Sequence, residues 1–437
     1  MAILVKPTVA GGFPEYLPEY QIEFERIKVI IAETYARHGF TPLDTPDLEK
    51  TEVLLAKGGG ETDKQVYQID KKPLSMRFDL TVPLARYAAE HQAELTFPFK
   101  RFHIGKVHRG ERNQAGRFHE FYQCDIDTIG TTSPLADAEF PAVINEIFTR
   151  LNFGKFVIRI NDRRVINGFF DLIGIADESK PEALHTLDKI EKMPKANFIK
   201  ELAVVGLNET QINKIIEFTE ISGESSKVIR ALESIGGGRE NEIFDAGIAS
   251  IRIVAEAVRA LGVPEENFKI DTKITRGLDY YTGTVYETFL VDYPELGSVC
   301  SGGRFDNLTE NYTETKLPGV GISIGLSRLF YALKENGTIK PGQKSPAKVV
   351  VFAMTEKEFA YAAEVAKVLR EAGVSTMLYT ESGKMKKKLS YADKMGFSYA
   401  LVIGESEVAG RTVSVKNMAL SEKEVIGIDE IVDKIIA

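Results

Sequence analysis

Arginines beside aromatic residues and glycines are the side chains of this sequence best suited to chemistry. The segment RGERNQAGRF sets Arg109, Glu111 and Arg117 around a polar turn. Guanidinium groups bind phosphate oxygens in pairs, and charge-assisted hydrogen bonds of this kind contribute roughly 1.5–3 kcal/mol each. A single charged turn is more often a solvated surface. Repetition favours an anion site, because further arginines stand beside glycines or at the start of a predicted element. These are Arg276, Arg304 and Arg328.

Glycines cluster in two segments near the later arginines, SGGRFD and GVGISIG. A residue without Cβ lets a ligand approach the backbone closely. Neither segment matches a P-loop or a dinucleotide-binding fingerprint. Together with the arginines, the glycines predict a nucleotide triphosphate bound on the surface of a sheet.

Composition and charge exclude several classes of protein. The net charge is −8, so a nucleic-acid partner needs a local basic face. Cys124 and Cys300 form no CxxC pair and the six histidines fit no ligand spacing, so we expect neither a disulfide nor a metal site. The N-terminal residues lack a signal-peptide pattern, and no apolar run approaches the roughly 20 residues that span a bilayer. We therefore expect a soluble, cytoplasmic protein with no membrane partner.

The elements that must position these side chains change in type along the chain. RFHIGKVH and EFYQCDIDTI predict the two strands of a hairpin around the arginine-rich turn, and residues 275–290 predict a further strand. Thr81 is expected to cap the helix that follows MRFDL. Helical periodicity without strand signals runs from about residue 171 to 261. This pattern predicts a helical insertion between two parts of one sheet.

A segment rich in Gly, Pro and Lys, KENGTIKPGQKSPAK, is the best candidate for a linker. Beyond it strands alternate with helices, which is typical of a small α/β domain. The sequence therefore predicts an α/β (α+β) chain in three parts. These are an antiparallel-sheet domain over residues 1–336 with its insertion at about 171–261, a linker over 337–346, and an α/β domain over 347–437.

A basic run lies in a predicted helix of the C-terminal domain. Met385, Leu389 and Ala392 recur at helical spacing, so one face of the helix packs and the lysines are expected to project outward. A solvated charged face is the more common meaning of such a run. The candidates for contact with a nucleic acid are Lys384, Lys386, Lys387 and Lys388.

Several segments, in order along nearly the whole chain, resemble signatures of class II aminoacyl-tRNA synthetases. GFTPLDTPDLE resembles the first motif, a dimer-interface element; the hairpin resembles the second, and GVGISIGLSRLF the third. TRGLDYYTGTVYE and SGGRFDNL are similar to two peptides peculiar to the histidyl-tRNA synthetase family. MRFDLTVPLARY resembles the amino-acid-binding segment of that family's eukaryote-like branch. KMKKKLSYADKMGFSYALVIGESEV resembles an anticodon-binding domain, in which the lysine run is expected to contact tRNA phosphates.

This resemblance implies a homodimer that uses L-histidine, ATP and a histidine tRNA. The histidine carboxylate attacks the α-phosphorus of ATP and the amino acid then passes to the 3′ end of the tRNA, with Mg²⁺ bridging phosphates largely through water. Arg109 and Arg276 are the implied catalytic residues, beside the α-phosphate and the histidine carboxylate. The other implied ATP contacts are Arg117 at the outer phosphates, Glu111 at the adenine amino group, and Phe121 and Arg328 on either side of the adenine ring.

The amino-acid site is implied in the same way. The implied residues are Asp79, Thr81 and Gln123 around the α-amino group, and Asp127, Tyr281 and Tyr280 around the imidazole. A carboxylate and a phenol suit a ring that donates at one nitrogen and accepts at the other. Phe305 stands where the family often has tyrosine, and the NQAG turn is a local variant. These departures leave one hydroxyl contact and the recognition of the tRNA acceptor end open.

Two other interpretations use the same fold. Some synthetase-like proteins are regulatory subunits of the first enzyme of histidine biosynthesis, but these usually lack the anticodon domain and the hairpin arginines. Synthetases for threonine, proline and glycine share the hairpin and the C-terminal domain. RGLDYYTG together with SGGRFD favours histidine over both alternatives.

Overall fold

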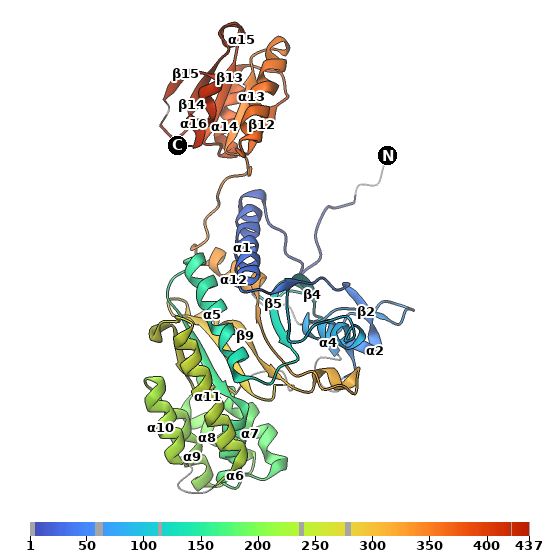
Figure 1. The fold of residues 1–437 in the computed structure, drawn as a ribbon, viewed down its shortest axis with the longest axis vertical. Helices are drawn as coiled ribbons and strands as arrows, with labels where there is room; N and C mark the ends of the chain where they lie inside the picture. Colours follow the sequence, from blue (N-terminus) through green and yellow to red (C-terminus); the bar gives the residue numbers. More distant parts are fainter. Residues whose placement is uncertain are drawn as a thin grey trace. The chain divides into compact units, whose positions relative to one another are not determined.

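The computed structural model describes residues 5–56, 64–111, 116–235, 240–275, 281–420 and 422–436. The chain forms two compact units, one of residues 1–14 and 28–338 and the other of residues 15–27 and 339–437. Helix α1 (Pro18–Arg37) contributes residues to both (Figure 1). Within the described ranges, no helix combines the length and the apolar character that a membrane crossing requires.

An eight-stranded sheet is the frame of the first unit, in the order β1-β4-β5-β10-β9-β8-β6-β7. The two outermost pairs, β1–β4 and β6–β7, are parallel and the pairs between them are antiparallel. The prediction of a mixed α/β chain with a large antiparallel sheet is confirmed. The strands are β1 (Thr41–Pro42), β4 (Phe99–His108), β5 (Glu120–Ile129), β6 (Phe156–Asp162), β7 (Phe268–Ile270), β8 (Thr284–Leu290), β9 (Ser298–Phe305) and β10 (Gly319–Ile324), with β2 (Leu48–Lys50) and β3 (Leu74–Met76) paired separately.

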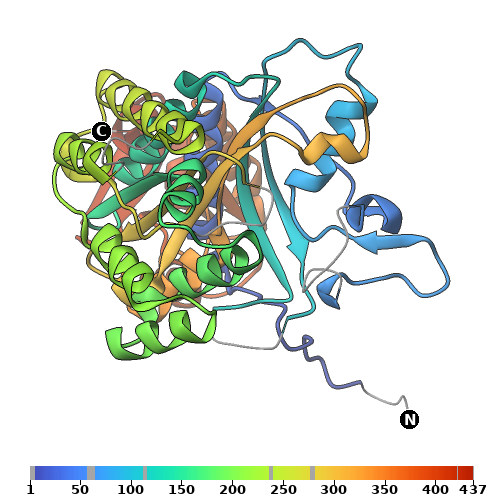
Figure 2. The same cartoon turned by 90° about the horizontal axis from the view of Figure 1, so that it is seen from below.

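Helices lie on both sides of the β4–β5 hairpin, with α2 and α4 on one side and the helices α6 to α11 on the other (Figure 2). Helices α6 and α11 cross closely, because a Cβ atom at Gly247 would stand 2.7 Å from the backbone nitrogen of Val165. The helices of this unit are α2 (Thr51–Leu54), α4 (Thr81–Glu90), α5 (Pro134–Leu151), α6 (Arg163–Leu172), α7 (Lys180–Leu187), α8 (Lys195–Val204), α9 (Glu209–Glu220), α10 (Ser225–Ile235), α11 (Glu242–Ala260) and α12 (Leu326–Glu335).

The two faces of the sheet differ in chemistry. Cys124 and Cys300 lie on either side of Ile324 across β5, β10 and β9, and all three are buried. Tyr35 of α1 covers this face and donates a hydrogen bond to the carbonyl of Cys124 at 2.9 Å. Because side chains alternate along a strand, the neighbours of Cys124 point to the opposite face. That opposite face is polar and glycine-rich.

A five-stranded sheet, in the order β12-β11-β13-β14-β15, forms the second unit. Its first three strands are parallel and the last two join antiparallel. Apolar side chains of α13 and α16 pack on one face and those of α14 on the other. The elements are β11 (Val349–Ala353), α13 (Phe359–Glu371), β12 (Thr376–Tyr379), α14 (Met385–Met395), β13 (Tyr399–Ile403), α15 (Glu405–Gly410), β14 (Thr412–Asn417), β15 (Lys423–Gly427) and α16 (Ile431–Ile436).

Candidate active site

Strand β5, between β4 and β10, carries two of the predicted histidine-binding residues, Gln123 and Asp127, on one face of the first unit's sheet. Across these strands and β9, one row of register partners consists of Arg101, Asp127, Gly321 and Gly303. Gln123 precedes Asp127 by four residues on β5, so both side chains point to the same side. We call this side of the sheet the site face.

Glycines make room on the site face for larger side chains. A Cβ atom at Gly321 would overlap Oδ1 of Asp127, and a Cβ atom at Gly303 would stand 2.9 Å from Cδ1 of Tyr281. Asp127 and Tyr281 therefore lie over adjacent glycines of β10 and β9. The structure brings together the two described residues predicted at the imidazole.

Asp127 is an acceptor held in place by a buried cation. Its Oδ2 lies 2.8 Å from Nη2 of Arg101, and both side chains are buried. That contact is not aligned as a hydrogen bond, so Oδ2 keeps its acceptor capacity, while Nη2 of Arg101 donates to the carbonyl of Leu80 at 3.0 Å. Burial raises the pKa of Asp127 to about 6, and the charge of Arg101 opposes the rise. The arrangement suits a carboxylate that meets a polar ligand atom.

Asp79 and Thr81 stand at the start of α4, beside this pair. Oδ1 of Asp79 accepts from the backbone nitrogen of Val82 at 3.0 Å, and the side chain of Asp79 is buried. Burial raises the pKa of Asp79, while a backbone hydrogen bond and the charges of Arg109 and Arg101 lower it. The expectation that Thr81 caps this helix is wrong, because Thr81 is the first helical residue and Asp79 accepts from the first turn instead.

The predicted ATP residues gather at the end of the β4–β5 hairpin. The guanidinium of Arg109 lies 4.3 Å from the ring centre of Phe78 and 5.1 Å from that of Phe121. Oε2 of Glu111 accepts a hydrogen bond from Arg117 at 3.0 Å, and Glu111 lies 3.9 Å from Arg109. Two cations and one carboxylate thus meet beside an aromatic ring.

Arg328 joins this group from α12. Its side chain is exposed, and its Nη2 donates to the carbonyl of Leu296 at 2.9 Å. A Cβ atom at Gly116 in the hairpin turn would lie 3.9 Å from Cγ of Arg328. Arg328 therefore lies close to the turn that carries Arg117.

Arg276 and Tyr280, both predicted at the site, lie outside the described residues. The chain on either side of them is held by Arg163 at the start of α6: its backbone nitrogen donates to Gly283 at 2.9 Å and its side chain donates to the carbonyl of Thr275. β8 begins only at Thr284, and Tyr281–Gly283 are not in a strand. The prediction of a strand over residues 275–290 is right for Thr284–Leu290 and wrong for Tyr281–Gly283.

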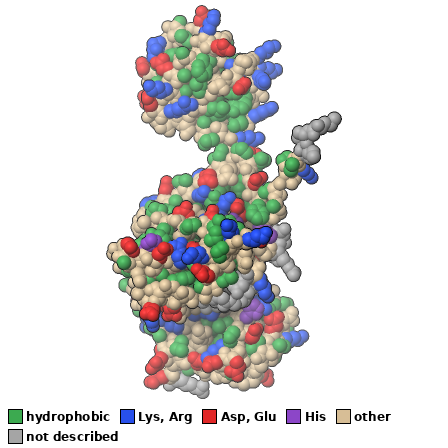
Figure 3. Space-filling model, turned by 90° about the vertical axis from the view of Figure 1, so that its right-hand side faces the viewer, with side chains coloured by type: hydrophobic (Ala, Val, Ile, Leu, Met, Phe, Trp, Pro, Cys, Tyr) green, Lys and Arg blue, Asp and Glu red, His purple; other side chains and the backbone are tan. Residues whose placement is uncertain are grey.

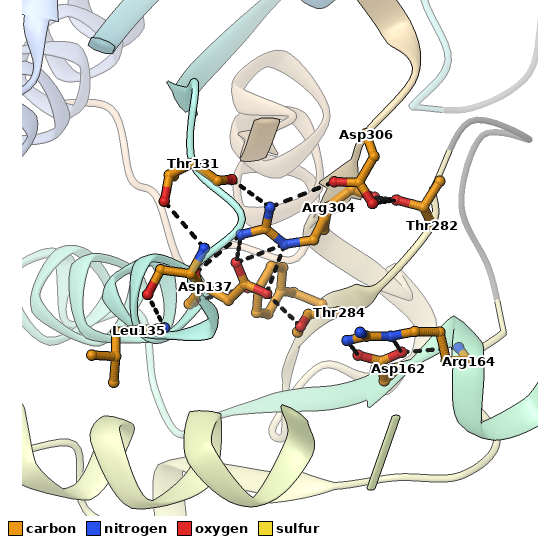
Figure 4. A network of polar contacts seen from close by, with 11 residues as sticks. Thr131, Leu135, Asp137, Asp162, Arg164, Thr282, Thr284, Arg304 and Asp306 are labelled. Atoms are coloured by element: carbon orange, nitrogen blue, oxygen red, sulfur yellow. Dashed lines mark hydrogen bonds and ion pairs between the residues drawn. The ribbon is translucent and has the colours of Figure 1, made fainter. Parts of the chain in front are cut away.

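Arg304 belongs to a buried ion pair, as Figure 4 shows. Its guanidinium contacts both carboxylate oxygens of Asp137 in α5, and its Nη1 donates to the carbonyl of Thr131 at 2.7 Å. Asp306 lies 3.6 Å from Arg304 and accepts from Thr282 at 2.6 Å. The anion that Arg304 meets is thus a protein carboxylate, which corrects the expectation of a nucleotide there. The pair holds the chain next to Tyr281.

Phe305 is on the site face, two residues from Gly303 on β9, but it lies in an apolar cluster and not among the polar groups. It is buried with Leu84 and Ala85 of α4, and Tyr281 packs against the same cluster. A tyrosine hydroxyl at this position would enter an apolar environment. The departure from the family pattern at Phe305 is therefore matched by local packing.

Three residues of the site were missed by sequence reasoning: Arg101, Asp125 and Ser323. Arg101 is fully buried and its partner lies 26 residues away, so only the register of the hairpin reveals the pair. Asp125 had a signal, because FYQCDIDT alternates polar and apolar residues and places Asp125 between Gln123 and Asp127 on one face.

The predicted lysines of the second unit differ in exposure. Lys384, Lys386 and Lys387 are exposed at the start of α14, and basic side chains project from this unit in Figure 3. Lys388 is buried and its Nζ donates to the carbonyl of Ala353 at 2.7 Å. The expectation that Lys388 projects outward is wrong, because its position on the helix faces β11.

Two family models match the chain. The model described as Histidyl-tRNA synthetase covers residues 12–329, and the model described as Anticodon binding domain covers residues 348–437. Relatives named Histidine--tRNA ligase include one from Clostridium tetani, 49% identical over 98% of this chain and 97% of its own length. Another, from Finegoldia magna, is 43% identical over 99% of this chain and 100% of its own.

Solved structures agree with these matches. A histidyl-tRNA synthetase from Nostoc sp. PCC 7120 superposes with a TM-score of 0.93 at 38% identity, over 99% of both chains. An ATP phosphoribosyltransferase regulatory subunit/histidyl-tRNA synthetase from Bacillus halodurans C shares the fold, with a TM-score of 0.76 at 21% identity over 92% of this chain and 99% of that one. By the family match and the identity over nearly its full length, the chain belongs to the histidyl-tRNA synthetase family.

Proposed function

We propose that this chain is an ATP-dependent histidine–tRNA ligase with a class II catalytic domain. It activates L-histidine with ATP to histidyl-adenylate and pyrophosphate, and then transfers histidine to the 3′ end of its tRNA. The observation that supports this most directly is the juxtaposition of Asp127 and Tyr281 over Gly321 and Gly303. The carboxylate of Asp127 and the ring of Tyr281 lie over adjacent glycines there. A carboxylate and a phenol suit an imidazole, which donates at one nitrogen and accepts at the other.

Catalysis in this proposal consists of positioning and charge stabilisation, without a side-chain nucleophile. Arg109 and Arg276 hold the α-phosphate and the histidine carboxylate, so that the carboxylate oxygen reaches phosphorus as pyrophosphate leaves. Arg109 is suited to this because its guanidinium lies 5.1 Å from the ring centre of Phe121 and its charge also acts on Asp79, whose pKa it lowers. It therefore stands between the predicted ATP and amino-acid residues.

ATP binds at the hairpin end. Arg117 exchanges its bond with Glu111 for the outer phosphates, which frees Glu111 to accept from the adenine amino group. Phe121 and Arg328 enclose the adenine ring. Mg²⁺ would enter with ATP and neutralise charge on its phosphates, because this hard ion keeps water and phosphate oxygens as ligands and needs few from the protein.

The amino acid binds on the site face. Asp79, Thr81 and Gln123 surround the α-amino group, and Asp127, Tyr281 and Tyr280 surround the imidazole. A site built on such hydrogen bonds discriminates in kcat/KM by a factor of about 10⁴–10⁵ against analogues that lack the partner groups. Selection of histidine therefore needs no separate editing step.

The organisation of the chain follows the same proposal. Residues 1–336 form the catalytic domain, 337–346 the linker and 347–437 the anticodon-binding domain, in which Lys384, Lys386 and Lys387 contact tRNA phosphates. The active species is a cytoplasmic homodimer, because the segment around Thr41–Leu48 resembles a dimer-interface motif. Sedimentation of the purified protein as a monomer at working concentrations would contradict the dimer.

Amino-acid-dependent ATP–pyrophosphate exchange with purified protein tests the activity. Exchange should be stimulated by histidine and not by threonine, proline or glycine. Arg276→Ala should keep measurable histidine binding and lose most of the exchange. Stimulation by another amino acid would refute the specificity. Absence of exchange with every amino acid would leave only a regulatory, synthetase-like role.

A further inference from the structure

On the part of the site face formed by β5, two buried oxygen atoms besides Oδ2 of Asp127 lack a hydrogen-bond partner among the described residues. They are Oε1 of Gln123 and Oδ1 of Asp125, and the two residues are 9% and 2% exposed. Buried acceptors are seldom left without a donor in a folded protein. A donor from outside the chain is therefore expected at this point of the sheet.

Ser323 fixes the direction of both acceptors. It stands opposite Asp125 in the β5–β10 register. Its Oγ accepts a hydrogen bond from Nε2 of Gln123 at 2.8 Å, and the same hydroxyl lowers the pKa of Asp125. The amide nitrogen of Gln123 therefore has an acceptor within the chain, and the amide oxygen is the atom without a donor. One hydroxyl thus orients two acceptors toward a common region.

Three buried carboxylates gather in this region, those of Asp79, Asp125 and Asp127. The cations that act on them are Arg101, which contacts Asp127, Arg109, which acts on Asp79, and Arg77, which acts on Asp125 but is paired with Asp47 at 2.7 Å. No residue in the described ranges forms an ion pair with Asp125. Burial raises the pKa of Asp125 to about 7, against the charge of Arg101 and with that of Asp127. A cationic ligand group beside Asp125 would relieve this burial of charge.

We propose that Asp125 is a further substrate-binding residue, which accepts a hydrogen bond from the α-ammonium of the amino acid together with Gln123, and that Ser323 is the positioning residue for both. A primary ammonium suits the site because it carries a positive charge and three donors and no acceptor. This inference rests on the proposed function, since it assigns a contact within the same amino-acid site.

Paired ligands test the contact. L-histidine is compared with 3-(imidazol-4-yl)propanoate, which keeps the ring and the carboxylate but lacks the amino group. Binding of each to the full-length protein is measured by calorimetry. Asp125→Asn should weaken histidine roughly 10- to 100-fold, as expected for a charge-assisted hydrogen bond. It should change the affinity for the analogue less than about threefold, the difference that such measurements resolve.

Two further variants separate binding from folding. Ser323→Ala should also lower the ratio of the affinity for histidine to the affinity for the analogue, by roughly 3- to 10-fold. The effect is smaller because both acceptors remain and only lose their orientation. Asp271→Asn is the matched control, since Asp271 is buried and lies 3.4 Å from Arg159 outside the site. The control should keep the wild-type ratio.

A wild-type ratio in both Asp125→Asn and Ser323→Ala would overturn the proposal. Equal loss of both ligands would overturn it too, because that result marks a purely structural role. If the wild-type protein binds another amino acid in place of histidine, the proposed function fails, and the same comparison with that amino acid and its deamino analogue decides the ammonium contact. Failure to bind any amino acid would refute both.

Discussion

Asp127 and Gly321 face each other across β5 and β10, and the carboxylate of Asp127 occupies the space that a Cβ atom at position 321 would fill. A side chain at position 321 and the predicted imidazole contact therefore exclude one another. The same Cβ atom would stand 2.7 Å from the carbonyl oxygen of Ile126, so a shift toward Ile126 would not remove the overlap. The observed position of the Asp127 carboxylate therefore requires a residue without a Cβ atom at position 321 of the neighbouring strand.

Gly321→Ala should displace Asp127 and raise the KM for histidine roughly 10- to 100-fold, because small misplacements of a positioning group have effects of this size. The KM for ATP should change little. Gly325→Ala is the matched control, since a Cβ atom there meets no atom within 4 Å. Pyrophosphate exchange measures all of these constants. Equal effects of the two substitutions would show that Gly321 acts through general stability alone.

Arg304→Met should destabilise the first unit by about 3–5 kcal/mol, because it leaves the buried carboxylate of Asp137 without its cation. Chemical denaturation of the purified protein provides the measurement. Adding Asp137→Leu to Arg304→Met should restore part of the stability, since no unpaired charge then remains. Lys195→Met is the control: it removes an exposed ion pair with Glu220 and should leave the denaturation midpoint nearly unchanged. A double variant no more stable than Arg304→Met would contradict the charge argument.

Asp125 should make the stability depend on pH. Burial raises its pKa to about 7, whereas an Asp in an unfolded chain titrates near 4. The folded protein therefore holds a proton that the unfolded chain releases, and the free energy of unfolding should fall as the pH rises from about 4 to about 7. Three pKa units correspond to at most about 4 kcal/mol.

Asp125→Asn removes this titration and should stabilise the protein more at pH 8 than at pH 5. Urea denaturation at the two pH values gives the comparison. Asp271→Asn, at a buried carboxylate outside the site, again serves as the control. A gain from Asp125→Asn that is the same at both pH values would refute an ionised, buried carboxylate at neutral pH.

The lysines of α14 should separate into two kinds. Charge reversal at Lys386 and Lys387 should weaken tRNA binding and lower its salt dependence by about one unit of slope per lost phosphate contact. Pyrophosphate exchange should remain intact. Lys388→Met should instead cost about 1 kcal/mol of stability and leave the salt slope unchanged, because Lys388 bonds the carbonyl of Ala353. Filter binding across a salt series distinguishes the two outcomes.

The sequence predicted the fold class well where the hydrophobic pattern was strong. The hairpin of β4 and β5 follows from two alternating runs around a polar turn, and the helices α7 to α11 follow from their period. It failed at Tyr281–Gly283, where Thr and Tyr suggested strand but the chain is held by Arg163 and by the Arg304 network. Tertiary contacts override local propensity at such a point.

The site was only partly accessible from the sequence, for a physical reason. A motif names the residues that touch a ligand, whereas the partners of those residues depend on strand register. Arg304 was expected to meet a phosphate, because its partner Asp137 lies 167 residues away and nothing local indicates it. Lys388 was expected to be exposed like its neighbours, because a charge run does not show which lysine faces the sheet.

Cys124 and Cys300 give the first unit a chemical reporter of its own. Burial raises the pKa of both thiols, and the thiolate is the form that reacts with alkylating reagents. Both cysteines of the chain belong to this unit, and none lies in residues 339–437. The rate of alkylation of the folded protein therefore measures the opening of the eight-stranded sheet and is blind to unfolding of the C-terminal strands. Substrates that bind on the opposite face should slow this labelling.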